Sequence, residues 1–209
     1  MSEEKGVIYR ISGPVVTAIG ISPRMYEVVR VGDEGLMGEV IELHGEQSVI
    51  QVYEETSGVR PGEPVIRTGQ TLSVQLGPGL LTKIYDGIQR PLPELEKTMG
   101  VFITRGVDAD GLDLEKNWQF NPTVKAGDSV SPGDVIGTVQ ETTTIEHRVM
   151  IPPGISGKIK EIKSGEFNVT QTVCILDDGN EVQMMQKWPV RTPRPFTKKH
   201  APEVPLQTG

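Results

Sequence analysis

The stretch GVIYRIS, residues 6–12, sets the pattern for the first third of the chain. Positions 7, 9 and 11 alternate with positions 8, 10 and 12, which is the period of two expected for a β-strand. The pair Gly13-Pro14 interrupts this pattern, and VVTAIG then resumes it. The sequence therefore begins with two strands separated by a turn.

Three more strand-like stretches follow at short intervals, each bounded by turn residues. They are YEVVRV (26–31), GEVIEL (38–43) and SVIQVY (48–53). Closely spaced strands with no helix among them indicate a small barrel or sandwich, and a barrel leaves no open edge that aggregates. We predict an N-terminal β-barrel over residues 1–70, and the 24 glycines and 16 prolines of the chain agree with many tight turns.

The pattern changes near residue 71. TLSVQL (71–76) is one more strand, and the spacing of Leu80, Ile84 and Ile88 predicts a short helix. A second short helix is expected to begin at Pro93 and to end at Gly100, because proline suits a first helical position and glycine a C-terminal cap. This gives a short α/β piece over residues 71–109.

Residues 110–186 predict a second β-rich module. KAGDSVSPGDVIGTV (125–139) contains Gly-Asp-x-Val and then Gly-Asp-Val-Ile, and Asp178-Gly179 between VCIL and EVQMM is a hairpin signal. Turns of this type resemble those of biotinyl and lipoyl carrier domains, although Lys158 and Lys187 lack the carrier setting of flanking Met or Asp. A plain sandwich of similar shape is the other interpretation, and the proline-rich residues 187–209 are expected to be extended.

Charge and composition exclude several classes of protein. The net charge is −7, with 21 basic and 28 acidic residues, which disfavours general nucleic-acid binding because phosphate contacts need clustered Lys and Arg. The single cysteine excludes an internal disulfide, and no apolar run approaches the roughly 20 residues that span a bilayer. The start MSEEKG lacks an apolar signal core, so a cytoplasmic location is expected.

Gly77-Pro78-Gly79 is a candidate phosphate-binding loop. Such a loop needs several backbone N–H groups at a helix N-terminus, and the dedicated P-loop also needs Gly-Lys-Ser/Thr. Pro78 has no N–H group, and no Gly-Lys-Ser/Thr follows it. We interpret this stretch as a structural turn.

Metal sites are not indicated either. His44, His147 and His200 are far apart in a chain with one cysteine, and no zinc-ligand spacing exists. The acids of GVDADGLDLE (Asp108, Asp110, Asp113 and Glu115) faintly resemble a calcium loop, but the bidentate glutamate is missing at the required spacing. We expect surface or hydrogen-bonded histidines and a solvated acidic turn.

The segment KWPVRTPRPFTKKH (187–200) is a candidate basic arm or docking strap. It carries Lys187, Arg191, Arg194, Lys198 and Lys199 without an acid. Its prolines favour an extended strap between domains or to a partner over a nucleic-acid arm. Cys174 lies among Val173, Ile175 and Leu176, so a buried structural cysteine is expected, and no catalytic, cofactor-binding or metal-ligating residue is predicted.

Several stretches together carry a resemblance to a known family. YRISGPVV, MYEVVRVGDEGLMGEVIEL, IQVYEETSGVRPGEPV, LGPGLLTKIYDGIQRPL and QMMQKWPVRTPRP occur in this order. They resemble the catalytic A subunits of archaeal and vacuolar-type rotary ATP synthases, over roughly residues 5–209. The resemblance implies that residues 71–109 are the first, incomplete part of a central nucleotide-binding domain. It also implies that residues 110–186 are the insertion typical of these proteins and that residues 187–209 lead toward the P-loop.

The resemblance also implies partners and cofactors. In this family A subunits alternate with B subunits in a hexameric ring, joined by stalk subunits and held peripherally at the cytoplasmic side of the membrane, where proton flow drives ATP formation. ATP, ADP and Mg²⁺ belong to the longer polypeptide. This sequence contains no Gly-x-x-x-x-Gly-Lys-Ser/Thr, so no catalytic residue is carried over and the chain alone is expected to be an inactive scaffold that binds no nucleic acid. The alternative is a stand-alone β-rich binding module, either carrier-like or RNA-binding.

Overall fold

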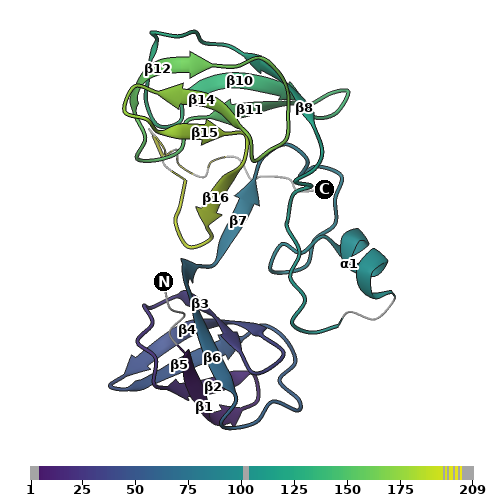
Figure 1. Cartoon of the computed structure of the whole chain (residues 1–209), viewed down its shortest axis with the longest axis vertical. Coiled ribbons are helices and arrows are strands. Elements are labelled where there is room, and N and C mark those ends of the chain that lie inside the picture. Colours follow the sequence, from purple (N-terminus) through teal and green to yellow (C-terminus); the bar gives the residue numbers. More distant parts are fainter. Residues whose placement is uncertain are drawn as a thin grey trace.

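The computed structural model describes residues 5–100, 104–194, 196, 198, 199, 201 and 203. Two β-rich lobes lie at opposite ends of the molecule and are joined by a two-stranded ribbon, with an irregular segment and one short helix beside the ribbon (Figure 1). The prediction of a mainly β protein with an N-terminal barrel and a second β-rich module is confirmed.

The N-terminal lobe is a closed barrel of antiparallel strands in the order β1-β2-β5-β4-β3-β6. Its strands are β1 (Lys5–Ser12), β2 (Val15–Ile19), β3 (Glu27–Val31), β4 (Leu36–His44), β5 (Gln47–Val52) and β6 (Pro64–Thr71). Closure pairs the first strand with the last, with Gly6 opposite Val65, so no strand of the barrel is left with an open edge.

Alternation along the strands fills the barrel interior. In β1, Ile8 is 2% exposed whereas Tyr9 is 58% exposed, and in β5 Ile50 and Val52 are both buried. The interior side chains are branched aliphatic or small, and a branched one contributes about 1.5 to 3 kcal/mol when fully buried. The barrel core consists of Ile8, Val16, Ala18, Ile21, Val29, Val31, Leu36, Val40, Ile50, Val52 and Val65.

The ribbon consists of β7 (Ser73–Leu76) and β16 (Gln186–Pro189), which pair antiparallel. The short helix predicted from Leu80, Ile84 and Ile88 is wrong, because these residues lie in turns and irregular backbone. Asp86 is the physical reason, since its carboxylate accepts hydrogen bonds from the backbone N–H groups of Ile88 (3.1 Å) and Arg90 (2.8 Å). These bonds offer the backbone an alternative to the helical pattern.

The second predicted helix is confirmed as α1 (Leu92–Met99). Proline occupies its first turn, and Gly100 follows its last residue with a φ of 76° and an N–H that donates to the Glu96 carbonyl at 2.8 Å. Among the helix side chains that the structure describes, that of Leu95 is buried, 2% exposed. The cap residues therefore set both ends of a helix that has little core of its own.

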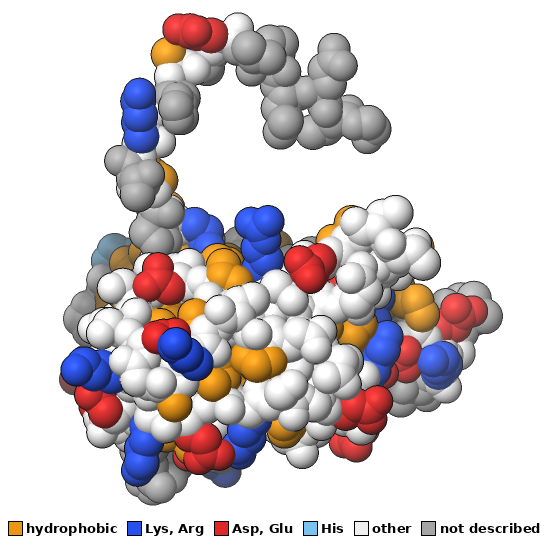
Figure 2. All heavy atoms as spheres, turned by 90° about the horizontal axis from the view of Figure 1, so that it is seen from above, with side chains coloured by type: hydrophobic (Ala, Val, Ile, Leu, Met, Phe, Trp, Pro, Cys, Tyr) orange, Lys and Arg blue, Asp and Glu red, His pale blue; other side chains and the backbone are white. Residues whose placement is uncertain are grey.

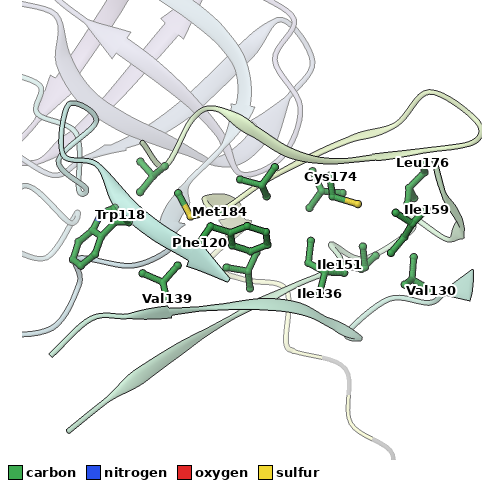
Figure 3. Packing of buried hydrophobic residues seen from close by; sticks show 14 of the residues in the cluster. Trp118, Phe120, Val130, Ile136, Val139, Ile151, Ile159, Cys174, Leu176 and Met184 are labelled. Atoms are coloured by element: carbon green, nitrogen blue, oxygen red, sulfur yellow. The ribbon is translucent and has the colours of Figure 1, made fainter. Parts of the chain in front are cut away.

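The second lobe packs two four-stranded sheets face to face, in the orders β11-β10-β8-β13 and β15-β14-β12-β9. Phe120, Ile136 and Leu176 are fully buried between the sheets (Figure 3). The strands are β8 (Trp118–Pro122), β9 (Ser129–Val130), β10 (Val135–Gln140), β11 (Glu146–Met150), β12 (Gly157–Ile162), β13 (Gly165–Phe167), β14 (Thr172–Leu176) and β15 (Glu181–Gln183).

The two repeated Gly-Asp turns of this lobe make equivalent hydrogen bonds. Asp128 accepts the N–H of Lys125 at 2.9 Å, and Asp134 accepts the N–H of Ser131 at 2.8 Å. The backbone at each turn exchanges hydrogen bonds with an isoleucine, Ile159 in the first case and Ile151 in the second. The predicted hairpin at Asp178-Gly179 joins β14 to β15. The sequence repeat thus forms two turns of the sandwich that have the same hydrogen-bond pattern.

Candidate functional site

A cluster of paired charges lies where the barrel meets the other segments, and we call it the ionic junction. Its barrel side is made of carboxylates on or next to β4 and β5, and its other side is made of arginines from outside the barrel. Its members are Glu34, Glu39, Glu54, Arg90, Arg105 and Arg191.

Glu39 is the most deeply placed carboxylate of the junction, because it lies on β4 with a side chain only 2% exposed. Arg191, at the foot of the ribbon, binds both of its oxygens, with Nε 3.0 Å from Oε1 and a terminal nitrogen on Oε2. The Tyr53 hydroxyl donates to Oε2 at 2.8 Å, and the guanidinium lies 4.5 Å from the Tyr26 ring centroid. This geometry is the bidentate arrangement that suits arginine and carboxylate.

The pKa values around Glu39 reflect this pairing. Burial by itself raises the pKa of Glu39, but the hydrogen bonds from Arg191 and Tyr53 outweigh burial and hold the pKa below its ordinary value. Burial, together with the hydrogen bond to the Glu39 carboxylate, raises the pKa of Tyr53 to about 12. Glu39 is therefore charged and Tyr53 neutral over the physiological pH range.

Arg90 is the buried cation of the junction, with a side chain 9% exposed. Its Nε lies 2.7 Å from Asp86, and one terminal nitrogen donates to the Val107 carbonyl at 2.9 Å and lies 3.6 Å from Glu54. Glu54, 7% exposed, also accepts the N–H of Gly106 at 2.6 Å. Burial raises the pKa of Asp86, but the bonds from Arg90 outweigh it and keep the pKa below its ordinary value.

Residues 105–108 complete the junction. Arg105 donates to Glu34 at 2.8 Å and to the Glu55 carbonyl at 2.9 Å, both on the barrel. In the opposite direction, Arg30 of β3 pairs with Asp108. The same short segment thus contacts the barrel through charges of both signs.

The acidic turn is exposed as predicted at Asp108, Asp110, Asp113 and Glu115, and three of these acids also make contacts within the protein. Asp108 pairs with Arg30, and Asp110 accepts the Gln75 side-chain amide at 2.7 Å. Asp113 accepts the N–H groups of Glu115 and Lys116 in a local turn. In the part of the chain that the structure describes, no three His, Cys, Asp or Glu side chains come together in a way that could hold a metal ion.

The Gly77-Pro78-Gly79 turn binds an anion, but that anion is a side chain of the protein. Glu141, 4% exposed, accepts the N–H groups of Gly79 (2.7 Å) and Leu81 (3.1 Å) through the same oxygen. A Cβ on Gly77 would lie 3.0 Å from Leu112, and a Cβ on Gly79 would lie 3.2 Å from the Trp118 ring. The glycines thus allow close packing against the sandwich core, and an internal carboxylate occupies the N–H groups that a phosphate would need.

The other candidate residues lie apart from one another. His44 is exposed and contacts Glu42 at 2.9 Å. His147 lies 3.7 Å from Glu141, and burial lowers its pKa although the Glu141 charge opposes this. Lys158 is exposed on β12. His200 lies outside the described residues.

Cys174 lies in the core, and Lys187, Arg191 and Arg194 lie on or next to the ribbon. Cys174 is fully buried in the sandwich core, and burial raises the pKa of its thiol. Lys187 is exposed on β16, Arg191 binds Glu39, and Arg194 stacks on the Trp188 ring at 4.3 Å. Lys198 and Lys199 are exposed. The outer end of the sandwich carries acidic and basic side chains side by side (Figure 2).

Sequence reasoning named Arg191 as part of the basic strap but missed its partner Glu39 and the other members of the junction. The one available signal was an acidic residue inside an apolar strand, as with Glu39 in GEVIEL, because a carboxylate that is buried at such a position needs a partner. Its partner Arg191 is 152 positions away, and no local pattern connects the two. None of the helices among the described residues combines the length and apolar composition required to cross a bilayer.

Two family models match the chain, one over each lobe. The family model described as ATP synthase alpha/beta family, beta-barrel domain, matches residues 8–69. The model described as ATPsynthase alpha/beta subunit barrel-sandwich domain matches residues 109–191. These two matches correspond to the two lobes of the structure.

Curated relatives extend the similarity along the chain. The A subunit of the A-type ATP synthase from Methanosarcina barkeri is 63% identical over 207 residues, which are 99% of this chain and 36% of the relative. Its counterpart in Methanosarcina mazei is 61% identical over 207 residues, again 99% of this chain and 36% of the relative. The counterpart in Natronomonas pharaonis is 58% identical over 99% of this chain and 35% of the relative. The chain therefore spans about a third of the length of the relatives it matches.

Proposed function

The chain belongs to the ATP synthase alpha/beta family, and from that premise we propose that it acts as the scaffold portion of the A subunit of an A-type ATP synthase. The observation that carries the proposal is the barrel, which is closed, has its own core, and is joined to the other segments through the ionic junction. A body of this kind keeps its shape while attached domains move.

The relatives that the chain matches are A subunits of A-type ATP synthases, and the proposal takes the activity of the whole subunit from them. We propose that the intact A subunit makes ATP from ADP and phosphate, with Mg²⁺, in a ring with B subunits that is driven by proton flow. The ring is attached through stalk subunits to the cytoplasmic side of the membrane. The residues of the present chain supply shape and assembly contacts rather than phosphoryl chemistry, which requires a positioned lysine and Mg²⁺ at the phosphates.

The outer wall of the barrel offers contacts for such a ring. Val7, Tyr9 and Leu43 are 42%, 58% and 42% exposed. They lie on the wall formed by β1, β2, β5 and β4, in which Val7 pairs with Ile19 of β2. Exposed apolar side chains on a closed barrel favour packing against a neighbouring barrel.

Nucleotide affinity provides the first test of the proposal. In calorimetry, the 209-residue chain is expected to show no ATP binding at micromolar concentration, whereas the full-length relative from Methanosarcina barkeri serves as the positive control. Micromolar ATP binding by the chain would contradict the scaffold role.

Ring assembly provides the second test. An excess of the chain, co-expressed with full-length A and B subunits, is expected to reduce the yield of complete rings by competing for barrel contacts. Tyr9→Arg should weaken this competition, whereas Thr143→Arg, on an exposed turn of the sandwich, should not. Equal competition by both variants would contradict the proposed wall.

A further inference from the structure

The two lobes have separate hydrophobic cores. One cluster of buried apolar residues fills the barrel and another fills the sandwich, and no described residue belongs to both. The contacts described above between the barrel and the remaining segments are mainly arginine–carboxylate pairs. Charge pairs fix direction well but, unlike a shared apolar core, lose strength in salt or when one partner changes its protonation.

The ribbon leaves the barrel through a short link. Leu72 connects β6 to β7, and the Leu72 carbonyl accepts the N–H of Val190 at 2.9 Å, so the barrel end of the ribbon holds both of its strands together. Arg191 follows directly and binds Glu39. The Arg191 side chain is thus placed to fix the direction in which the ribbon leaves the barrel.

The contact between Arg191 and Glu39 depends on the negative charge of the Glu39 carboxylate. With Arg191 bound, the buried carboxylate has a cation on both oxygens and the Tyr53 hydroxyl on one. Without Arg191 it would be a buried charge with only neutral donors, a state that proteins avoid by taking up a proton. The carboxylate would then bind one proton from solvent, and the guanidinium would keep its charge in water.

We propose that Glu39 and Arg191 form a proton-linked latch that holds the ribbon, and with it the sandwich, in one direction relative to the barrel. Opening the latch lets the ribbon pivot at Leu72 while both lobes stay folded. The segment 105–108 contacts the barrel separately through Arg105. Opening the latch therefore releases the ribbon from the barrel but leaves this second contact in place.

Among the described residues, few groups face Glu39. Tyr53 donates to it and is neutral, and Tyr26 stacks on Arg191. On the neighbouring strands, Glu27 of β3 is paired with Arg67 of β6, with Arg67 Nε 2.9 Å from Glu27 Oε1, so these two charges compensate each other. Arg191 is therefore the cation on which the charge of Glu39 depends.

The proposal does not depend on ATP formation, and it is tested on the whole 209-residue chain. Spin labels are placed by Glu46→Cys on the β4–β5 turn and Thr143→Cys on the β10–β11 turn, in a Cys174→Ser background. Pulsed electron paramagnetic resonance then measures the distance distribution between barrel and sandwich. Arg191→Ala is compared with Arg194→Ala, a matched arginine that stacks on the Trp188 ring of the ribbon.

Arg191→Ala is expected to broaden the distance distribution, and Arg194→Ala to leave it as in the parent. Glu39→Gln, which removes the charge and keeps the shape, is expected to broaden it as well. An NMR titration of the Glu39 carboxyl should show its pKa moving from below to above its ordinary value in Arg191→Ala only. An unchanged distribution in Arg191→Ala, equal broadening in Arg194→Ala, or a pKa of Glu39 that stays low would each overturn the latch.

Discussion

Gly137 shows how a single missing side chain sets the packing of the sandwich. A Cβ at this position would lie 2.3 Å from two atoms of the Phe120 ring, which is fully buried. Gly137→Ala is expected to lower the free energy of unfolding by about 1 to 3 kcal/mol, because overpacking displaces the ring. Urea unfolding followed by tryptophan fluorescence measures the loss, since Trp118 belongs to the same core and Trp188 lies on the adjoining ribbon.

Gly87 offers the matched control for this substitution. A Cβ there meets nothing within 4 Å, so Gly87→Ala is expected to change the free energy of unfolding by no more than about 0.5 kcal/mol. A loss of the same size at Gly87 and Gly137 would show that the glycine backbone, and not the Phe120 contact, matters.

Glu141 and His147 give a prediction of pH dependence. Burial lowers the pKa of His147, and the Glu141 charge partly opposes that shift. Glu141→Gln removes the opposing charge, so the pKa of His147 should fall further. Because a neutral His147 is favoured in the folded protein, its contribution to stability is present above the unfolded pKa of roughly 6.5 and is lost as the pH falls below it.

An NMR titration of His147 in the parent and in Glu141→Gln measures this effect. A rise in the pKa of His147 in Glu141→Gln would be incompatible with the 3.7 Å contact between the two side chains.

At the scale of elements, residues 80–100 contain one helix that the sequence predicts correctly and one that it predicts wrongly. The α1 helix was predicted because proline and glycine act within one or two positions of its ends. The helix over 80–88 was predicted from Leu80, Ile84 and Ile88 and is wrong, because Ile84 faces solvent at 66% exposure and Leu80 packs against the sandwich. The spacing of apolar residues does not reveal that the Asp86 carboxylate accepts hydrogen bonds from backbone N–H groups of the same stretch.

Asp86 is accordingly the residue on which this loop depends. Asp86→Ala is expected to cost about 1 to 3 kcal/mol in the free energy of unfolding, because the guanidinium of Arg90, 9% exposed, loses its closest carboxylate and keeps only Glu54 and the Val107 carbonyl as partners. Amide hydrogen exchange of residues 84–91 should accelerate in parallel. Lys97→Ala is the control, since Lys97 is 71% exposed and its pairing with Glu94 contributes little. Slow exchange in Asp86→Ala would mean that other contacts order the loop.

At the scale of the whole molecule, local sequence patterns predicted each lobe but not the way they are joined. Strand alternation in GVIYRIS and the paired Gly-Asp turns act over a few residues, and both lobes follow from such signals. Glu39 and Arg191 are brought together only by closing the barrel and by returning the chain through β16. The family resemblance, carried by stretches spread over the chain, is confirmed by the relatives and was the one long-range signal in the sequence.

Separate cores joined by charge pairs predict two unfolding transitions. Both tryptophans, Trp118 and Trp188, lie in the sandwich and the ribbon, so their fluorescence reports that part of the chain, while amide signals of β1 to β6 report the barrel. In urea at low salt the two transitions should lie close together, since the ionic junction couples the lobes. Added sodium chloride should separate them, because screening weakens exposed pairs such as Arg105 with Glu34. Coincident transitions at every salt concentration would show that the lobes form one cooperative unit and that the charges at the junction do not set their coupling.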